Sequence, residues 1–303
     1  MEPLPPLGLE EWEPTKDTLH LWVQIVGKVK MASLPPRNHW WHVPLYLGVR
    51  GLTTRTLHSA DGTAFEIRFD FHDHRLVVET ADAVRSFELV DGLSVADFDA
   101  QLHRALGELD VTILENPYGV EATTPFPADR EHASYDADAV ERFWRVLDWS
   151  GGVLDEFSGW FCGKQSPVHL FWHGLDLAVT RFSGRRAPAM PDADHVTQEA
   201  YTHEVISFGF WAGDQNVREP TYYSYTLPEP AGLRDRQLSP AQAFWADQGT
   251  GSLARLPYEV VRTADDPRQT LLEFLESAYE AGADAAGWDL VDLMSSWCPI
   301  PAA

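Results

Sequence analysis

Apolar residues recur at helical spacing in four stretches of the chain. Side chains three or four positions apart lie on one face of an α-helix, so each stretch predicts an amphipathic helix. The helices predicted in this way cover residues 15–32, 94–109, 138–157 and 267–286. Ser94 is a residue type that caps helices, and the pair Gly151-Gly152 is a point where the third helix could break.

Alternating apolar and polar residues predict strands between these helices. The predicted strands cover residues 40–49, 65–71, 76–80 and 86–90 in the first half and residues 168–182, 204–211 and 222–227 in the second. Asp61-Gly62 and residues 72–75 are typical of tight turns between consecutive antiparallel strands. Runs of strands bracketed by helices, without strict alternation of the two, indicate an α+β fold with antiparallel sheets.

The two halves of the chain resemble each other in the order of their residues. The run from His39 aligns without a gap on the run from His169, and further matches follow in the same order. The matched pairs are Leu45/Leu175, Leu47/Leu177, Val49/Val179, Arg55/Arg185, Ile67/Ile206, Phe69/Phe208, Phe71/Phe210, Ser86/Ser224, Phe87/Tyr225, Leu89/Leu227, Leu93/Leu238, Ser94/Ser239, Pro117/Pro257, Tyr118/Tyr258 and Val120/Val260. Short alternating strands also resemble one another by pattern alone, but the shared order indicates an internal duplication. In the second copy the third strand is shortened or lost around residues 213–219.

The length of the chain fits two modules or one large domain. Single cores stop growing near about 250 to 300 residues, and the chain has 303. Residues 123–134 are rich in proline and polar residues, which is typical of a boundary. This boundary divides the chain into a first α+β module over residues 1–125 and a second over residues 136–303, and the two could also pack as one globular unit.

The second module places charges in rows of otherwise apolar residues. Side chains of a strand alternate between its two faces, so residues of one parity share a face. The apolar row in residues 175–179 continues with Arg181, and the apolar row in residues 206–210 is preceded by Glu204. If these two strands are regular and pair antiparallel, Arg181 and Glu204 meet at one rim of the buried face.

This pair of charges has two interpretations, because buried charges are costly unless they are paired. In the structural one, Arg181 and Glu204 form a salt bridge that closes the core, and the protein is a non-catalytic ligand-binding or interaction protein. In the functional one, the protein is an enzyme or binder acting on an anionic small molecule. That interpretation assigns Arg181, Arg185 and Arg186 to an anion clamp, Glu204 and His203 to proton transfer, and Tyr223, Tyr225, His173 and Trp211 to the binding surface.

A long irregular stretch, residues 184–201, separates the two charged strands. Such stretches in a compact protein are more often functional than accidental. We expect it to form a lid that carries Arg185 and Arg186 over the pocket. The alternative is a solvated loop whose arginines pair with an acidic surface.

The charge of the chain excludes two classes of partner. Its 46 acidic and 23 basic residues give a net charge of −23, which repels nucleic-acid phosphates and anionic lipids. The N-terminal residues lack the basic start and apolar run of a signal peptide, and no stretch reaches the roughly 20 apolar residues that span a bilayer. We therefore expect a cytoplasmic protein that binds neither nucleic acid nor membranes.

Metal and cofactor motifs are missing from the sequence. Cys162 and Cys298 are too few for a disulfide framework and do not form a CxxC pair. No HExxH, P-loop, GxGxxG, GxSxG or EF-hand motif occurs. His72 and His74 share the polar face of a strand, which favours solvent exposure over metal binding. No metal or cofactor is expected, and the sequence names no substrate, reaction class or oligomeric state.

Several stretches resemble one known family over nearly the whole chain. The resemblance is carried by LHLWVQIVGKVKMA and NHWWHVPLYLGVRGLTT in the first half and by FWHGLDLAVTRFSGRRAP, EAYTHEVISFGFWAGD, YYSYTLPEP and LPYEVVR in the second. These stretches are similar to an uncharacterised bacterial family known as domain of unknown function 5996. The resemblance implies a soluble, cytoplasmic bacterial protein and supplies no reaction, cofactor or catalytic residue. His173 and Gly174 depart from the pattern of the family, which weakens a catalytic role for His173.

Overall fold

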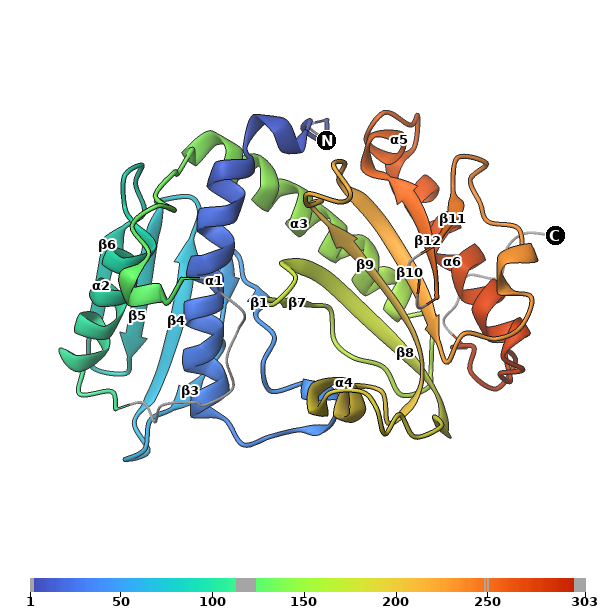
Figure 1. The fold of residues 1–303 in the computed structure, drawn as a ribbon, viewed down its shortest axis with the longest axis horizontal. Helices are drawn as coiled ribbons and strands as arrows, with labels where there is room; N and C mark the ends of the chain where they lie inside the picture. The colour runs from blue at the N-terminus through green and yellow to red at the C-terminus, as the bar shows by residue number, and fades with distance from the viewer. Residues whose placement is uncertain (1–2, 113–123, 248, 250, 297–303) are drawn as a thin grey trace.

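The structure, a computed structural model, describes residues 3–112, 124–247, 249 and 251–296. Two antiparallel sheets of six strands each lie on either side of helix α1 (Glu13–Ser33), and helix α3 (Ala137–Ser158) runs behind the second sheet (Figure 1). This combination of helices and antiparallel sheets confirms the predicted α+β class. Within the described residues, no helix combines the length and the apolar character needed to cross a membrane.

Each sheet is built mainly from strands that are neighbours in sequence. The first has the order β1-β2-β4-β5-β6, with β3 paired to β4, and the second has the order β11-β12-β10-β9-β8-β7. The strands are β1 (Tyr46–Leu47), β2 (Leu52–Thr53), β3 (Leu57–His58), β4 (Ala64–Asp70), β5 (Arg75–Thr80), β6 (Val84–Glu88), β7 (His169–Phe171), β8 (Asp176–Arg186), β9 (His203–Trp211), β10 (Thr221–Leu227), β11 (Phe244–Asp247) and β12 (Ser252–Pro257).

The four predicted helices are present. The remaining helices are α2 (Val95–Gly107), α4 (His195–Ala200), α5 (Tyr258–Arg262) and α6 (Pro267–Ala285), together with the 3-10 turns η1 (Leu9–Glu11), η2 (Asn38–Trp40), η3 (Phe126–Ala128) and η4 (Leu233–Asp235). Ser94 caps α2 as expected, since its Oγ accepts a 3.1 Å hydrogen bond from the backbone N–H of Asp97. Helix α3 does not break at its two glycines. A Cβ on Gly151 would lie 2.4 Å from Leu47 Cδ1, so this glycine lets β1 approach the helix.

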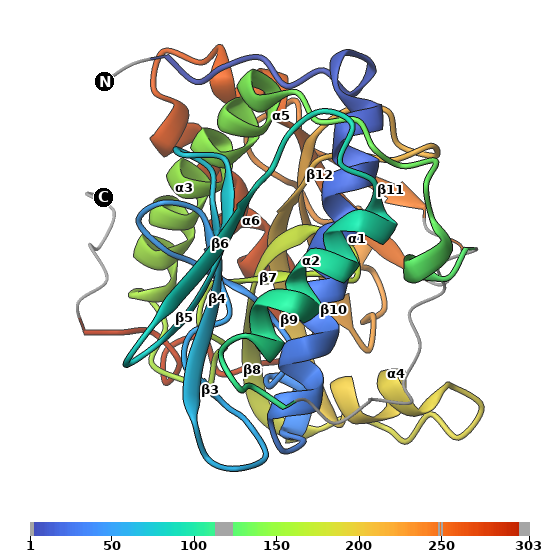
Figure 2. The same cartoon turned by 90° about the vertical axis from the view of Figure 1, so that its left-hand side faces the viewer.

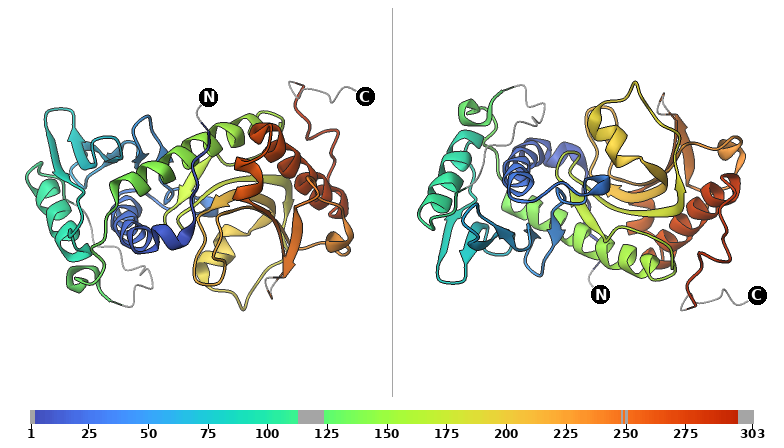
Figure 3. Two further views of the ribbon diagram at one scale, coloured as in Figure 1. Left: turned by 90° about the horizontal axis from the view of Figure 1, so that it is seen from above. Right: turned by 90° about the horizontal axis from the view of Figure 1, so that it is seen from below.

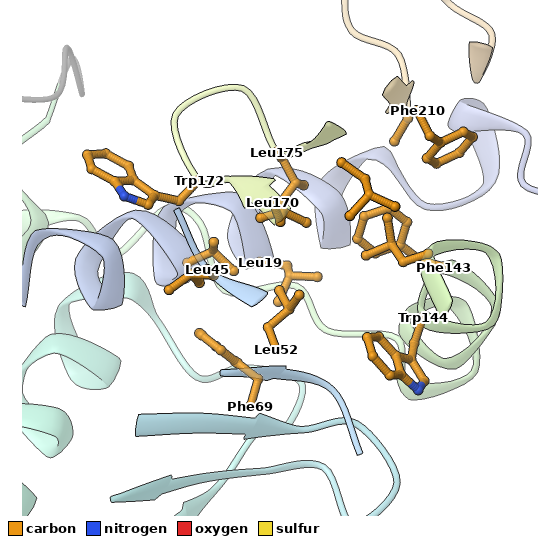
Figure 4. Close-up of a cluster of buried hydrophobic side chains, with 14 of the residues drawn as sticks. Leu19, Leu45, Leu52, Phe69, Phe143, Trp144, Leu170, Trp172, Leu175 and Phe210 are labelled. Atoms are coloured by element: carbon orange, nitrogen blue, oxygen red, sulfur yellow. The ribbon is translucent and has the colours of Figure 1, made fainter. Parts of the chain in front are cut away.

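One continuous core joins the two sheets. Helices α1 and α2 pack together against one face of the first sheet (Figure 2), and α1 lies in the middle of the molecule with one sheet on either side (Figure 3). Where the sheets meet, Leu45 and Leu170 exchange two backbone hydrogen bonds of 2.9 and 2.8 Å. Around this point, buried side chains from both halves of the chain pack against each other (Figure 4). One hydrophobic core therefore contains residues from both halves of the chain, and the division into two modules stays a prediction.

Two of the predicted strands are interrupted in the structure. Residues 40–49 contain only the two-residue strand β1, because His39 and Trp40 in η2 both have a φ of 58°. Residues 168–182 are divided into β7 and β8 by a turn in which Leu175 has a φ of 53°. A backbone in this left-handed region cannot continue a pleated strand, so the chain turns at both places.

The duplication stays a prediction. Residues 212–220 form no strand, so β9 leads directly to β10, as expected for the shortened second copy. The aligned residues Val49 and Val179 differ in environment, however, with exposed fractions of 94% and 0%. The alignment of Pro117, Tyr118 and Val120 falls outside the described residues.

A buried lysine links α1 to the first sheet. The Nζ of Lys30 donates hydrogen bonds to the carbonyl oxygens of Pro44 at 2.5 Å and Thr54 at 2.9 Å. It also lies 4.5 Å from the centre of the Tyr46 ring. Burial lowers the pKa of Lys30 to about 7, and the nearby guanidinium of Arg55 acts in the same direction.

The lowered pKa of Lys30 predicts a pH-dependent stability. Between the folded pKa of about 7 and the ordinary lysine value of about 10.4, the unfolded chain binds more protons at this position, so stability rises with pH. From pH 7 to pH 9, the free energy of unfolding of the native protein should gain about 2 kcal/mol over that of Lys30→Met. Urea denaturation at both pH values measures the difference, with Lys28→Met on the same helix as the control. A constant difference between native protein and Lys30→Met would contradict the prediction.

Candidate functional site

A cavity of about 760 Å³ lies on the face of the second sheet opposite α3 and α6. Strands β8, β9 and β10 form its floor. Its sides are formed by helix α1, the turn η2, residues 171–174 and helix α4. In Figure 1 these elements lie together in the centre of the molecule, although they come from both halves of the chain.

Strand alternation explains how one sheet serves both a core and a cavity. Leu177, Phe208 and Tyr222 project towards α3, where the hydroxyl of Tyr222 lies 2.8 Å from Ser150 Oγ. Residues of the other parity face away from α3, and several of them border the cavity. Those in the cavity lining are Asp176, Ser207, Trp211, Tyr223 and Tyr225.

A glycine makes room for one of the tyrosines in the floor. Gly209 is paired with Tyr223 across β9 and β10, and a Cβ at this glycine would lie 2.6 Å from the Tyr223 hydroxyl oxygen. The same Cβ would lie 2.3 Å from the carbonyl oxygen of Leu177. The Tyr223 ring therefore lies across a position where only glycine fits.

A carboxyl group at the floor of the cavity accepts a hydrogen bond from this tyrosine. The Tyr223 hydroxyl donates to Asp176 Oδ2. Burial raises the pKa of Asp176 to about 6, although the hydrogen bond from Tyr223 acts in the opposite direction. Within the described residues no lysine or arginine forms an ion pair with this carboxyl group. Asp176 thus presents to the cavity a carboxyl group whose pKa lies close to neutral pH.

A second pair of tyrosines connects the floor with α4. The hydroxyl of Tyr201, directly after α4, lies 2.9 Å from the hydroxyl of Tyr225. The rings of Tyr223 and Tyr225 stack with their centres 6.3 Å apart. Burial raises the pKa of both Tyr201 and Tyr225, so these phenols act as neutral donors and acceptors.

Helix α4 is held over the side of the cavity by the strained turn η2. Trp40 Nε1 donates to the carbonyl oxygen of Val196 at 3.1 Å, and His39 Nδ1 donates to that of Ala200 at 2.9 Å. Left-handed conformations cost roughly 1–2 kcal/mol per residue, and backbone strain of this kind clusters at functional sites. Part of the irregular stretch over residues 184–201 therefore borders the cavity, as expected of a lid, but its two arginines are not in the lining.

Helix α1 determines where Asp176 lies. His20 Nε2 donates to the carbonyl oxygens of Trp172 at 3.1 Å and His173 at 2.9 Å. The indole of Trp172 packs directly over Gly27, where a Cβ would lie 2.4 Å from the ring. These contacts hold the turn that leads into β8, and Asp176 is the first residue of that strand.

Four of the residues predicted from the sequence line the cavity: Tyr223, Tyr225, His173 and Trp211. The other five lie elsewhere. Register places Tyr223 and Tyr225 on the face of the sheet opposite Arg181, which is paired with Ile206. The predicted residues are therefore divided between two faces of one sheet.

Arg181 is sealed inside the core, with an exposed fraction of 1%. Its Nη2 donates a 2.6 Å hydrogen bond to the carbonyl oxygen of Phe157, and its guanidinium lies 3.5 Å from the centre of the Phe157 ring. The Tyr279 ring lies 4.4 Å away. Burial raises the pKa of Glu276 on α6, and the positive charge of Arg181 opposes this shift. An anion from solvent cannot reach this arginine.

The expected meeting of Arg181 and Glu204 does not occur, because β8 and β9 are not regular there. Their register shifts between Phe182 and Arg186, and a bulge of this kind changes the face to which side chains point. Glu204 instead accepts hydrogen bonds from Ser183 and from Arg185, both at 2.8 Å. Arg185 also donates to two carbonyl oxygens after α6. Arg185 therefore forms a surface ion pair with Glu204 and caps the C-terminal end of α6.

Sequence reasoning missed Asp176, His20, His39 and Tyr201. The sequence did contain an indication for Asp176. The residues that alternate with the core residues of β8, β9 and β10 include small and polar residues and two tyrosines, and Asp176 is one of them. The other three come from segments whose place beside the sheet depends on tertiary packing.

Within the described residues, no group of three or more histidine, cysteine or acidic side chains could hold a metal ion. Searches of curated proteins and of solved structures find no match to this chain. A family model does match, over residues 4–295, and it describes a family of unknown function. The chain therefore belongs to the DUF5996 family.

Proposed function

We propose that the protein binds a small molecule in this cavity and recognises a positively charged or hydrogen-bond-donating group with Asp176. The observation that carries the proposal is the Asp176 carboxyl at the floor, where Tyr223 donates to one oxygen and no lysine or arginine of the described residues forms an ion pair with it. A ligand amine or hydroxyl would supply the missing donor. The volume of about 760 Å³ is that of an ordinary small-molecule site.

The aromatic lining supports a cationic ligand. Trp40, Trp172, Trp211, Tyr223 and Phe171 all contribute to the cavity. Cations bind favourably to aromatic faces, and a carboxylate among aromatic rings is a common way to bind an ammonium group. The anionic ligand expected from the sequence would need a basic clamp, but Arg181 is buried on the far face of the sheet and Arg185 is paired with Glu204.

Acid–base catalysis is a second candidate function. A carboxyl group with a pKa of about 6 is largely ionised at neutral pH and still basic enough to accept a proton. Tyr223 is placed to stabilise the carboxylate form. In this version Asp176 removes a proton from the bound molecule.

We also propose that the protein is bacterial and cytoplasmic.

The site predicts that Asp176 lowers stability. Its raised pKa means that the folded protein binds more protons than the unfolded chain between about pH 4 and pH 6, so stability falls as pH rises through this range. Asp176→Asn removes this loss and still accepts from Tyr223. The gain in unfolding free energy should be about 2 kcal/mol larger at pH 7.5 than at pH 4.5. Chemical denaturation at both pH values measures this gain, with Asp192→Asn at an exposed position as the control. If the gain does not depend on pH, the raised pKa of Asp176 is wrong.

The charge of the ligand can be tested with three molecules of the same shape. Benzylammonium should bind best, benzyl alcohol less well and benzoate least, because only the first two offer a donor to Asp176. Asp176→Asn should weaken benzylammonium binding by about tenfold or more, since it removes the charge from the hydrogen bond. Tryptophan fluorescence and thermal shift provide the readouts.

Glu204→Gln is the matched control for this experiment, because it removes a carboxylate outside the cavity and should leave benzylammonium binding unchanged. Preferred binding of benzoate, or equal binding of benzylammonium by native protein and Asp176→Asn, would reject the proposed role of Asp176.

A further inference from the structure

Basic side chains from four segments of the chain converge beside η2. His39 belongs to η2, Lys164 to the loop after α3, Arg186 to the end of β8 and His203 to the start of β9. Lys164 Nζ lies 2.8 Å from His39 Nε2, and the rings of His39 and His203 have their centres 5.5 Å apart. We call these four residues the basic cluster.

Backbone pairing brings the members of the basic cluster together. The backbone N–H of Phe182 donates to the carbonyl oxygen of Lys164 at 2.9 Å, which lays the Lys164 loop along β8. Arg186 and His203 are direct partners in the β8–β9 ladder, beyond the bulge. The Lys164 ammonium lies 4.8 Å from the centre of the Phe182 ring and 5.3 Å from that of Trp41. Backbone pairing thus positions both segments, and the aromatic rings hold the Lys164 ammonium in place.

The charge of the basic cluster is not neutralised by the protein. Within the described residues, neither Lys164 nor Arg186 forms an ion pair. Burial lowers the pKa of His203, and Lys164 and Arg186 lower it further, so both cations lie close enough to act on this ring. Glu199 on α4 raises the pKa of His39, but this is the smallest of the effects on that ring. In a chain with a net charge of −23, an unpaired group of cations is unexpected.

The arginine before Arg186 does form an ion pair with a carboxylate at the end of β8. Arg185 has a carboxylate partner, Glu204, at 2.7 Å. Arg186, one residue later, is exposed and has no carboxylate partner in the part of the chain that the structure describes. His203 uses Nδ1 towards Thr202 Oγ1 at 3.0 Å, which leaves Nε2 for another partner. His39 accepts from Lys164 at Nε2 and therefore orients the lysine.

We propose that the basic cluster is a binding site for a phosphate group beside the cavity around Asp176. His39 borders both, but in the basic cluster it orients Lys164 and does not contact the phosphate. Lys164 and Arg186 supply two positive charges, which match a dianion, and His203 Nε2 supplies a further polar contact. The proposal does not depend on the function proposed for the cavity, because the two sites use different residues for ligand contact. The phosphate group belongs either to inorganic phosphate or to a phosphorylated organic molecule.

Titration calorimetry at constant ionic strength tests this site. Inorganic phosphate should bind at least about tenfold more tightly than acetate, and Lys164→Met and Arg186→Met should each weaken phosphate binding by about tenfold or more. Lys164→Arg should retain binding. The control is Arg104→Met, which removes an exposed arginine of α2 and should bind phosphate like the native protein. Glycerol 1-phosphate is the second probe. Tighter binding of glycerol 1-phosphate supports a phosphorylated organic ligand, and equal binding supports inorganic phosphate.

NMR of the histidine rings provides an independent measurement. Phosphate should shift the signals of His39 and His203 in the native protein but not in Lys164→Met, with an unchanged melting temperature showing that the variant is folded. Phosphate that binds no better than acetate, or binds equally to native protein and both methionine variants, would overturn the proposal.

Discussion

The packing of α1 between the two sheets is the contact on which the rest of the structure depends. Its apolar face completes the core of the first sheet, while Gly27 and His20 hold the turn that begins β8. The place of Asp176 is therefore set by a helix more than 140 residues earlier in the chain. The two backbone hydrogen bonds between Leu45 and Leu170 also connect the two sheets, next to α1.

The two faces of the second sheet differ: one packs on helices and stabilises the fold, and the other borders the cavity. Large apolar side chains of one parity pack on α3 and α6, and this packing supplies the hydrophobic stabilisation. The other parity carries Gly209, Ser207 and Asp176, which contribute little apolar burial and leave a cavity. Burial raises the pKa of Asp176, and a carboxyl group with a raised pKa lowers the stability of the folded protein at neutral pH.

Arg181 illustrates why a charge in an apolar row was not a reliable sign of a binding site. Its guanidinium lies against the rings of Phe157 and Tyr279, so aromatic faces and a backbone carbonyl oxygen accommodate it inside the core. The parity argument placed Arg181 correctly in the interior. It failed for Glu204, because the register shift after Phe182 moved that side chain to a different set of neighbours.

The sequence alone determined the α+β class, the long helices and most regular strands, because periodicities of 3.6 and 2 residues are local properties of each segment. Four residues that it assigned to a binding surface, Tyr223, Tyr225, His173 and Trp211, line the cavity, and their binding role stays a prediction. Only the tertiary structure decided which residues meet there. His20, His39 and Asp176 are brought together by left-handed turns and the placement of α1, and these depend on contacts between distant segments that no local pattern encodes.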